Sequence, residues 1–212
     1  MPRIIALAQR KSGVGKTTLA VSIAAEIRRC GGNVALVDTD PQRSACDWAE
    51  PGNLGFPVHG LTIGDASVST WAEAVMRFDV DYLVIDTAPN DQALAASIAL
   101  SHVVLLPCTA SGLDIEATNR ALEILEAVRL RRRDSVQVAI VPNRVDMRTR
   151  EGRQLVDELR QTGERIGPPV GNRSAFERAF SKGMPVCDHA PGGNADMEIR
   201  ALWLAVQRML SG

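Results

Sequence analysis

Apolar and polar positions follow each other in regular blocks along the chain. Short uninterrupted apolar runs, rich in Val, Ile and Leu, predict strands that are covered on both faces. These runs lie at 3–8, 33–37, 82–85, 103–106 and 136–141. Between them, apolar residues recur at helical spacing, and the predicted helices cover roughly 16–30, 70–78, 92–100, 113–133, 152–162 and 195–210. The alternation predicts an open, mostly parallel, doubly wound α/β sheet with helices on both faces.

The blocks run without an internal repeat or a linker rich in Pro or Gly, so we expect one domain over residues 1–212. The stretch 51–64 combines glycine and proline with little periodicity, and it predicts no regular element. A chain of 212 residues with 45% hydrophobic and 23% charged residues can bury a substantial core.

Cysteine usage and charge narrow the class further. The four cysteines are far apart and form no CxxC pair, which favours reduced packing residues of a cytoplasmic protein. The opening residues contain no apolar run long enough for a cleavable leader. Because the net charge is only −1, any contact with nucleic acid must come from a local basic patch.

A run rich in glycine and lysine lies between the first strand and the first helix. Glycines let the backbone approach a polyphosphate closely, and the helix that begins at Lys16 directs its positive dipole end to the same place. Lys16 is predicted to reach the β- and γ-phosphates, and the Thr17 hydroxyl to ligate Mg²⁺. The alternative, a turn that binds nothing, does not explain Gly-Lys-Thr-Thr at this junction. We expect ATP and Mg²⁺ as cofactors, bound by Lys11, Ser12, Gly13, Val14, Gly15, Lys16, Thr17 and Thr18.

This loop departs from the standard phosphate loop. Arg10 stands where a glycine is usual, five residues before Gly15, and Lys11 is an additional lysine. The pattern Lys-x-Gly-x-Gly-Lys-Thr-Thr resembles the deviant Walker A loop of the ParA/MinD family of ATPases. The resemblance implies that Lys11 crosses a dimer interface to the nucleotide of the other subunit. Ser12 replaces the first of two family glycines, but it keeps its N–H donor.

Carboxylates follow two of the predicted strands. Asp38 and Asp40 come after the second strand, and by itself the Asp-Pro pair indicates only a turn. The resemblance makes this segment a switch in which Asp40 positions water and the metal shell, and Asp38 supports the loop. Asp86 ends the third strand, where phosphate-loop enzymes hold Mg²⁺. We expect the metal at Thr17, Asp40 and Asp86, a second switch at Thr87-Ala88-Pro89, and catalytic roles for Lys11, Lys16 and Asp40.

Two positions are candidates for the adenine base through the resemblance. Asn143 follows the strand at 136–141 and matches the family position that hydrogen-bonds adenine, although a polar turn residue is an equal alternative. Pro185 belongs to a turn that resembles the loop closing over the base through backbone groups.

Basic residues gather in two later segments. The resemblance implies an ATP-dependent homodimer that binds DNA non-specifically and a ParB-like or other cargo adaptor that stimulates slow hydrolysis, so the protein is expected to be cytoplasmic and nucleoid-associated. Candidate DNA contacts are Arg148, Arg150, Arg153, Arg173, Arg178 and Lys182. A solvated helix face remains the alternative for each. The run 131–133 ranks below them because cations at a helix end also favour the dipole.

Other functions share parts of this pattern. A membrane-positioning relative of the MinD type needs a basic amphipathic tail, whereas this chain stops two residues after Leu210, so no membrane partner is expected. Iron–sulfur electron donors need ligating cysteines in other contexts. A small-molecule kinase or ligase needs a polar substrate pocket of its own, and a non-hydrolysing module would lack Asp40 or Lys16. No helix-turn-helix precedes the first strand, so operator-specific repression is not expected.

Overall fold

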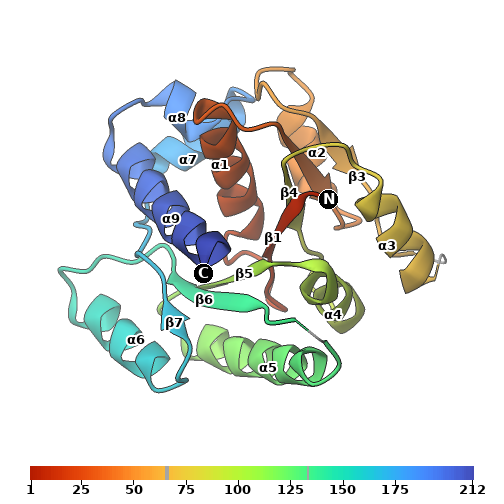
Figure 1. The fold of residues 1–212 in the computed structure, drawn as a ribbon. Coiled ribbons are helices and arrows are strands. Elements are labelled where there is room, and N and C mark those ends of the chain that lie inside the picture. The colour runs from red at the N-terminus through yellow and green to blue at the C-terminus, as the bar shows by residue number, and fades with distance from the viewer. Residues whose placement is uncertain (65–66, 133) are drawn as a thin grey trace.

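The computed structural model describes residues 1–64, 67–132 and 134–212. Its centre is a seven-stranded sheet in the order β3-β2-β4-β1-β5-β6-β7, in which every pairing is parallel (Figure 1). The strands are β1 (Arg3–Leu7), β2 (Val34–Asp38), β3 (Val58–Gly60), β4 (Tyr82–Asp86), β5 (Val103–Cys108), β6 (Gln137–Pro142) and β7 (Arg165–Ile166). The predicted parallel α/β sheet is confirmed.

Helices cover both faces of this sheet (Figure 1). On one face lie α1 (Lys16–Arg29), α2 (Ser44–Ala49), α7 (Ser174–Ser181), α8 (Val186–His189) and α9 (Asn194–Ser211). On the other lie α3 (Val68–Met76), α4 (Asp91–Leu100), α5 (Gly112–Arg129) and α6 (Arg150–Arg160). Alternate side chains of β1 pack on opposite faces of the sheet. Ile5 and Leu7 belong to one hydrophobic core, and Ile4 and Ala6 belong to the other. The sheet is therefore doubly wound, as predicted.

Every strand and helix that the apolar pattern predicts is present. Their ends are displaced from the predicted positions by a few residues at most. The largest displacement concerns the helix predicted at 113–133, which ends at Arg129, while residue 133 lies outside the described residues. The pattern missed β3, β7, α2 and α8, and β3 falls within the stretch 51–64 that predicted no element. Two or three residues are too few to show a period, so only pairing with a neighbouring strand identifies β3 and β7.

The strand order reverses at β1. This strand lies between β4 and β5, and the chain builds one half of the sheet on each side of it. Open parallel sheets bind ligands at the carboxyl ends of their strands beside such a reversal. The register places Leu7, Asp38 and Asp86, the last residues of β1, β2 and β4, at one level. The predicted phosphate loop and both strand-end aspartates therefore meet at the same edge.

Candidate functional site

The loop after β1 has the backbone shape that an anion site requires. Gly13 and Gly15 have φ angles of 78° and 98°, in the left-handed region that favours glycine. Gly15 is also the N-cap of α1, and no side chain caps this helix. The N–H groups of the first turn of α1 are thus left for a ligand, and the dipole favours a negative one.

Asn143 braces this loop from the end of β6. Its side-chain nitrogen donates a hydrogen bond of 2.6 Å to the Val14 carbonyl, and the residue is only 4% exposed. The same amide packs so closely against Gly15 that no Cβ would fit there. Asn143 is therefore more than a polar turn residue. One of its two amide N–H groups is engaged by the loop, so Oδ1 and the second N–H are left for a ligand.

Lys16 lies inside the site with 7% of its surface exposed. Its Nζ donates to the Lys11 carbonyl at 3.0 Å, across the mouth of the loop. Burial lowers the pKa of Lys16, while the charges of Asp86 and Asp40 oppose that effect. A buried ammonium facing the loop is an electrostatic partner for phosphate oxygens.

Thr17 and Asp86 form the centre of the candidate metal site. The Thr17 hydroxyl donates to Asp86 Oδ2 at 2.6 Å. Burial raises the pKa of Asp86 to about 7, and the Thr17 hydrogen bond opposes this rise. Beside them the buried Thr87 hydroxyl has no hydrogen-bond partner among the described residues. A hard cation held by oxygen ligands and water fits this set of groups.

No three His, Cys, Asp or Glu side chains come together as a metal cluster within residues 1–64, 67–132 and 134–212. A cation here would thus take its remaining ligands from water and from the bound phosphates, which is the usual arrangement for Mg²⁺. Asp40 lines the cavity and can contribute through water. The residues present therefore fit Mg²⁺ with a nucleotide rather than a metal held by protein alone.

Asp38 and Thr39 organise the segment that carries Asp40. Asp38 is fully buried and accepts hydrogen bonds from the N–H groups of Asp40, Ala45 and Cys46, which confirms its loop-supporting role. Burial raises the pKa of Asp38, although these backbone bonds act against the rise. The Thr39 hydroxyl donates to the Asp86 carbonyl and accepts from the Ala88 N–H.

Thr39 therefore joins the segment after β2 to the segment after β4. The sequence analysis did not predict a role for Thr39. The feature of the sequence that could have indicated one is its position between the two aspartates of Asp-Thr-Asp. The Thr39 hydroxyl bonds the last residue of β4 and Ala88 beyond it, so the two segments are held together at this point.

The two cations that precede Ser12 are both paired within the chain. Lys11 forms an ion pair with Asp114 in the first turn of α5, and Asp114 also accepts from the Thr109 hydroxyl. The Lys11 side chain is 36% exposed and that of Asp114 only 3%. Arg10 pairs with Asp91 at the start of α4, with 2.5 Å between Nε and Oδ1. The sequence did not indicate either acidic partner.

A cavity of about 520 Å³ opens from the loop towards α2 and α7. Besides the loop residues, its wall contains Asp40, Gln42, Ser44, Trp48, Asn143, Arg144, Gly171, Asn172, Arg173, Phe176, Glu177, Phe180 and Ser181. Trp48 and Phe180 pack edge to face with their ring centroids 5.2 Å apart. Aromatic side chains at the end away from the loop provide a surface for a planar base.

The structure does not bring Pro185 to this cavity. Pro185 is buried as the N-cap of α8, and its carbonyl accepts from the N–H groups of Asp188 and His189. The neighbouring Met184 carbonyl accepts from Trp48 Nε1 at 3.0 Å. The backbone groups of this turn are therefore engaged within the chain, and α7 lies nearer the base end than the turn does.

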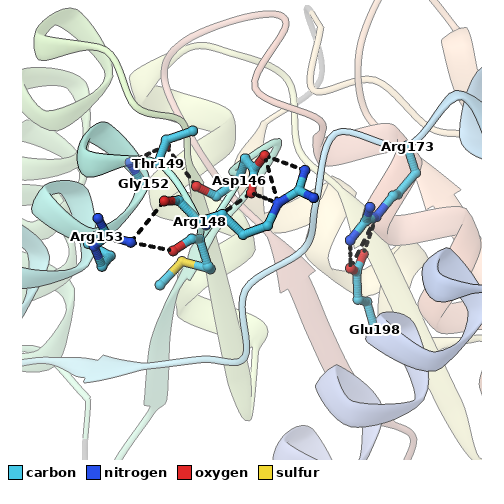
Figure 2. Close-up of polar contacts among 8 residues, drawn as sticks. Asp146, Arg148, Thr149, Gly152, Arg153, Arg173 and Glu198 are labelled. Atoms are coloured by element: carbon cyan, nitrogen blue, oxygen red, sulfur yellow. Dashed lines mark hydrogen bonds and ion pairs between the residues drawn. The ribbon is translucent and has the colours of Figure 1, made fainter.

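Three of the predicted DNA-contacting arginines, Arg148, Arg153 and Arg173, are engaged by contacts within the chain (Figure 2). Arg148, whose side chain is 90% exposed, pairs with Asp146, and its hydrogen bonds lower the pKa of that carboxyl to about 2. Arg173 makes a two-pronged contact with Glu198 of α9. Arg153 donates to the carbonyl of Arg148 at 2.9 Å.

Segments far apart in the chain supply this basic surface. Arg148 precedes α6 and Arg173 precedes α7. The hydrogen bond with Glu198 raises the pKa of Arg173, and the positive charge of Arg148 opposes this rise. Arg150, Arg178 and Lys182 are exposed on α6, on α7 and at the end of α7. The surface therefore lies beside the candidate nucleotide cavity, and Arg173 contributes to both.

The run 131–133 has a structural role at Arg132. Its guanidinium donates to the carbonyls of Ile98, Ala99 and Ser101 at the end of α4, and it pairs with Asp134. A cation of this run thus lies at the carboxyl end of a helix, as expected. The helix that Arg132 caps is α4, not the helix α5 that precedes it in the chain. Arg133 lies outside the described residues.

Known proteins resemble this chain in sequence. Residues 5–186 match the CobQ/CobB/MinD/ParA nucleotide binding domain. Maintenance of carboxysome distribution protein A of Halothiobacillus neapolitanus is 29% identical over 178 residues, covering 82% of this chain and 80% of the relative. The chromosome-partitioning ATPase Soj of Thermus thermophilus is 30% identical over 221 residues, covering 89% of both chains.

Solved structures share the fold. Apo McdA of Cyanothece has a TM-score of 0.80 at 16% identity and covers 99% of this chain and 100% of its own, and the same protein is also solved as an ATP complex. The MinD cell division protein of Aquifex aeolicus has a TM-score of 0.80 at 16% identity, covering 97% of both chains. Cobyrinic acid a,c-diamide synthase of Mycobacterium smegmatis, with bound ADP and magnesium, has a TM-score of 0.74 at 20% identity and covers 100% of this chain and 96% of its own.

In the part of the chain that the structure describes, no helix has the length and apolar character needed to cross a membrane. The family model spans most of the chain and includes the loop, both strand-end aspartates and the segments that carry the predicted DNA-contacting arginines. The chain belongs to the CobQ/CobB/MinD/ParA nucleotide-binding family.

Proposed function

We propose that this protein is a ParA-type ATPase that dimerises on ATP, binds DNA non-specifically and hydrolyses ATP slowly until a partner stimulates it. The observation that carries the proposal is the meeting of an uncapped phosphate loop with Thr17, Asp40 and Asp86 at one edge of the sheet. The partitioning and carboxysome-distribution relatives support the same class of function.

The residues of the loop have distinct roles in this proposal. The N–H groups from Ser12 to Thr18 bind the phosphates, and Lys16 lies against the β- and γ-phosphates. Thr17 ligates Mg²⁺ directly, and Asp40 and Asp86 hold its water shell. When bound, Mg²⁺ neutralises charge on the transferred phosphoryl group. Asp40 orients the attacking water, because it is the least buried member of the Asp-Thr-Asp segment and lines the cavity.

The base lies at the other end of the cavity. Asn143 reaches it through Oδ1 while its nitrogen keeps the loop in place. Phe176 and Phe180 form an apolar wall there. A contact from Pro185 would be through its backbone and would require its present hydrogen bonds within α8 to change.

Lys11 makes the site depend on a second copy of the chain. In the free subunit its ammonium is neutralised by Asp114. In the proposed dimer Lys11 leaves Asp114 and contacts the triphosphate of the partner, so the interface is complete only with ATP. Hydrolysis removes the γ-phosphate, and the joined switch segments relax together through Thr39.

The basic surface supplies the DNA contacts. Arg148, Arg150, Arg173, Arg178 and Lys182 contribute phosphate contacts, and dimerisation doubles their number. Asp146 and Glu198 compete with phosphate for Arg148 and Arg173. Affinity should therefore be low for one subunit and fall steeply with salt for the dimer. A nucleoid-associated location follows from this binding.

The cargo adaptor is proposed to be a ParB-like or similar protein that stimulates hydrolysis on the DNA-bound dimer. The names of two relatives state carboxysome distribution and chromosome partitioning, and a structural neighbour from Borrelia burgdorferi is named a plasmid partition protein. The nature of the cargo is left to the adaptor, because the nucleotide site is common to all of them.

The test is retention on a non-specific DNA duplex together with solution mass, each measured without nucleotide, with ADP and with ATP, over a series of salt concentrations. We expect a dimer and salt-sensitive retention with ATP only. Arg150→Glu with Arg178→Glu should abolish retention and keep the dimer, whereas Arg77→Glu with Arg120→Glu, an equal charge change on α5 and at the end of α3, should do neither.

Two other results would redirect the proposal. An ATP dimer that ignores DNA would indicate a membrane or protein-only positioning ATPase. A chain that stays monomeric with ATP would favour the alternative of a small-molecule kinase or ligase. The diamide synthase, which shares this fold, is named as a small-molecule enzyme.

A further inference from the structure

A second hollow lies at the edge of the sheet, apart from the nucleotide cavity. It has a volume of about 720 Å³, and residues of α6, β7 and α9 line it. Figure 1 shows where these three elements lie at this edge of the sheet. Its wall consists of Pro142, Met147, Val156, Arg160, Gly163, Glu164, Arg165, Ile166, Gly167, Pro168, Pro169, Ala205 and Arg208. We refer to these residues as the edge groove. No residue of the phosphate loop or of the switch segments contributes to it.

One end of the edge groove is apolar. Met147 is 38% exposed there, and Pro168 and Val156 lie beside it. An exposed methionine that lines a hollow together with prolines is typical of a surface that binds apolar side chains.

The other end of the edge groove is cationic. Arg160 is the last residue of α6, Arg165 begins β7, and Arg208 lies in the last turn of α9. Since α6 and α9 run opposite to the strands, these ends meet at the amino-terminal edge of the sheet, away from the nucleotide. Arg165 and Arg208 form no ion pair within the described ranges of the chain. The wall has one carboxylate, Glu164, which Arg129 already neutralises at 2.5 Å.

The sheet edge itself limits what can bind. The last strand, β7, has only two residues and pairs only with β6. Pro168 and Pro169 follow it and have no N–H to donate. Prolines at an edge prevent open-ended strand addition. Recognition must therefore come from the charged and apolar side chains of the groove rather than from a long backbone ladder.

We propose that the edge groove binds an acidic, partly apolar segment of a partner protein. Carboxylates of the segment pair with Arg165 and Arg208, and its apolar side chains pack on Met147 and Pro168. The apolar half favours a protein over DNA, because phosphates gain nothing from Met147 or the prolines. This surface is additional to the proposed ATP and DNA sites, and its binding does not require ATP.

The experiment uses the full chain and a short fluorescent peptide with one half of Glu and Asp and one half of Leu and Val, made in both orders. Fluorescence anisotropy reports binding. We expect binding with and without ATP, and a loss of about tenfold or more in Arg165→Glu with Arg208→Glu, since two contacts become repulsive. Met147→Ser should weaken binding as well, because the apolar end then loses a contact.

Controls separate this site from general charge effects. Arg77→Glu with Arg120→Glu changes the net charge equally on other elements and should leave binding unchanged. A peptide with Lys in place of Glu and Asp should not bind. Three results would overturn the proposal. The groove variant could bind the peptide as well as the wild type does, or neither acidic peptide could bind at all. The third is that a DNA duplex displaces the peptide through the same arginines.

Discussion

Exchange of the Asp114 carboxylate for an amide is expected to tighten the ATP-dependent dimer. In the free subunit, Lys11 is bound to Asp114, which is nearly buried and also accepts from Thr109. If Lys11 must leave this partner to reach the nucleotide of the other subunit, the cost of breaking the pair opposes dimerisation. Asp114→Asn keeps the shape and an acceptor for Thr109 but removes the charge that holds Lys11.

The magnitude follows from the exposure of the pair. Lys11 is about one-third exposed, so its contact with Asp114 contributes about 1 kcal/mol rather than the larger value of a fully buried pair. Each dimer breaks two such pairs, and about 2 kcal/mol corresponds to roughly a thirtyfold lower dimer dissociation constant. The melting temperature of the free subunit should fall slightly, because the same contact is lost there.

Sedimentation equilibrium with a non-hydrolysed ATP analogue measures this constant directly. Glu116→Gln, on the same helix and with the same charge change, is the matched control and should leave the dimer unchanged. Asp114→Asn combined with Lys11→Gln should lose the gain, because no lysine remains to cross. An unchanged or weaker dimer in Asp114→Asn alone would refute the exchange of partners by Lys11.

Three further predictions concern the site. Asn143→Ala should destabilise the protein by about 1–3 kcal/mol in chemical denaturation and weaken nucleotide binding, because the buried Val14 carbonyl loses its donor; wild-type affinity would contradict the bracing role. In metal-free protein, stability should decrease as pH rises from about 4 to about 7, since the pKa of Asp86 is raised from 3.8 to about 7 and its proton favours the folded state. The full effect is about 4 kcal/mol, Asp86→Asn should flatten the slope, and an equal slope in that variant would reject the assignment. Asp40→Ala should retain ATP binding and accumulate the ATP dimer without turnover, so phosphate release at the wild-type rate would exclude Asp40 from catalysis.

Local spacing in the sequence was enough to predict the fold class and the residues at the centre of the site. The strands and long helices follow from apolar runs and helical periods, which depend on a few neighbouring residues. Thr17 and Asp86 were predicted together because a strand-end carboxylate and a phosphate loop must lie at the same edge of a parallel sheet, and their hydrogen bond bears this out. The glycines that the loop needs for its backbone shape, Gly13 and Gly15, were also predicted from the sequence.

The sequence did not predict which side chains contact the phosphate loop from other strands and helices. Asp114, which holds Lys11, and Asn143, which braces Val14, lie about a hundred residues or more from the loop they contact. Their positions depend on β1 lying beside β5 and on β6 lying next to it, and no periodicity encodes that order.

The sequence by itself thus determined that this chain forms a phosphate loop at the head of a doubly wound sheet, because glycine freedom, helix dipoles and apolar periods act over short distances. Only the tertiary structure decided which carboxylates hold Lys11 and Arg10, which helices line the cavity beside the loop, and that Arg165 and Arg208 share a groove. These contacts are long-range, and they arise when strand order and helix packing bring distant segments together.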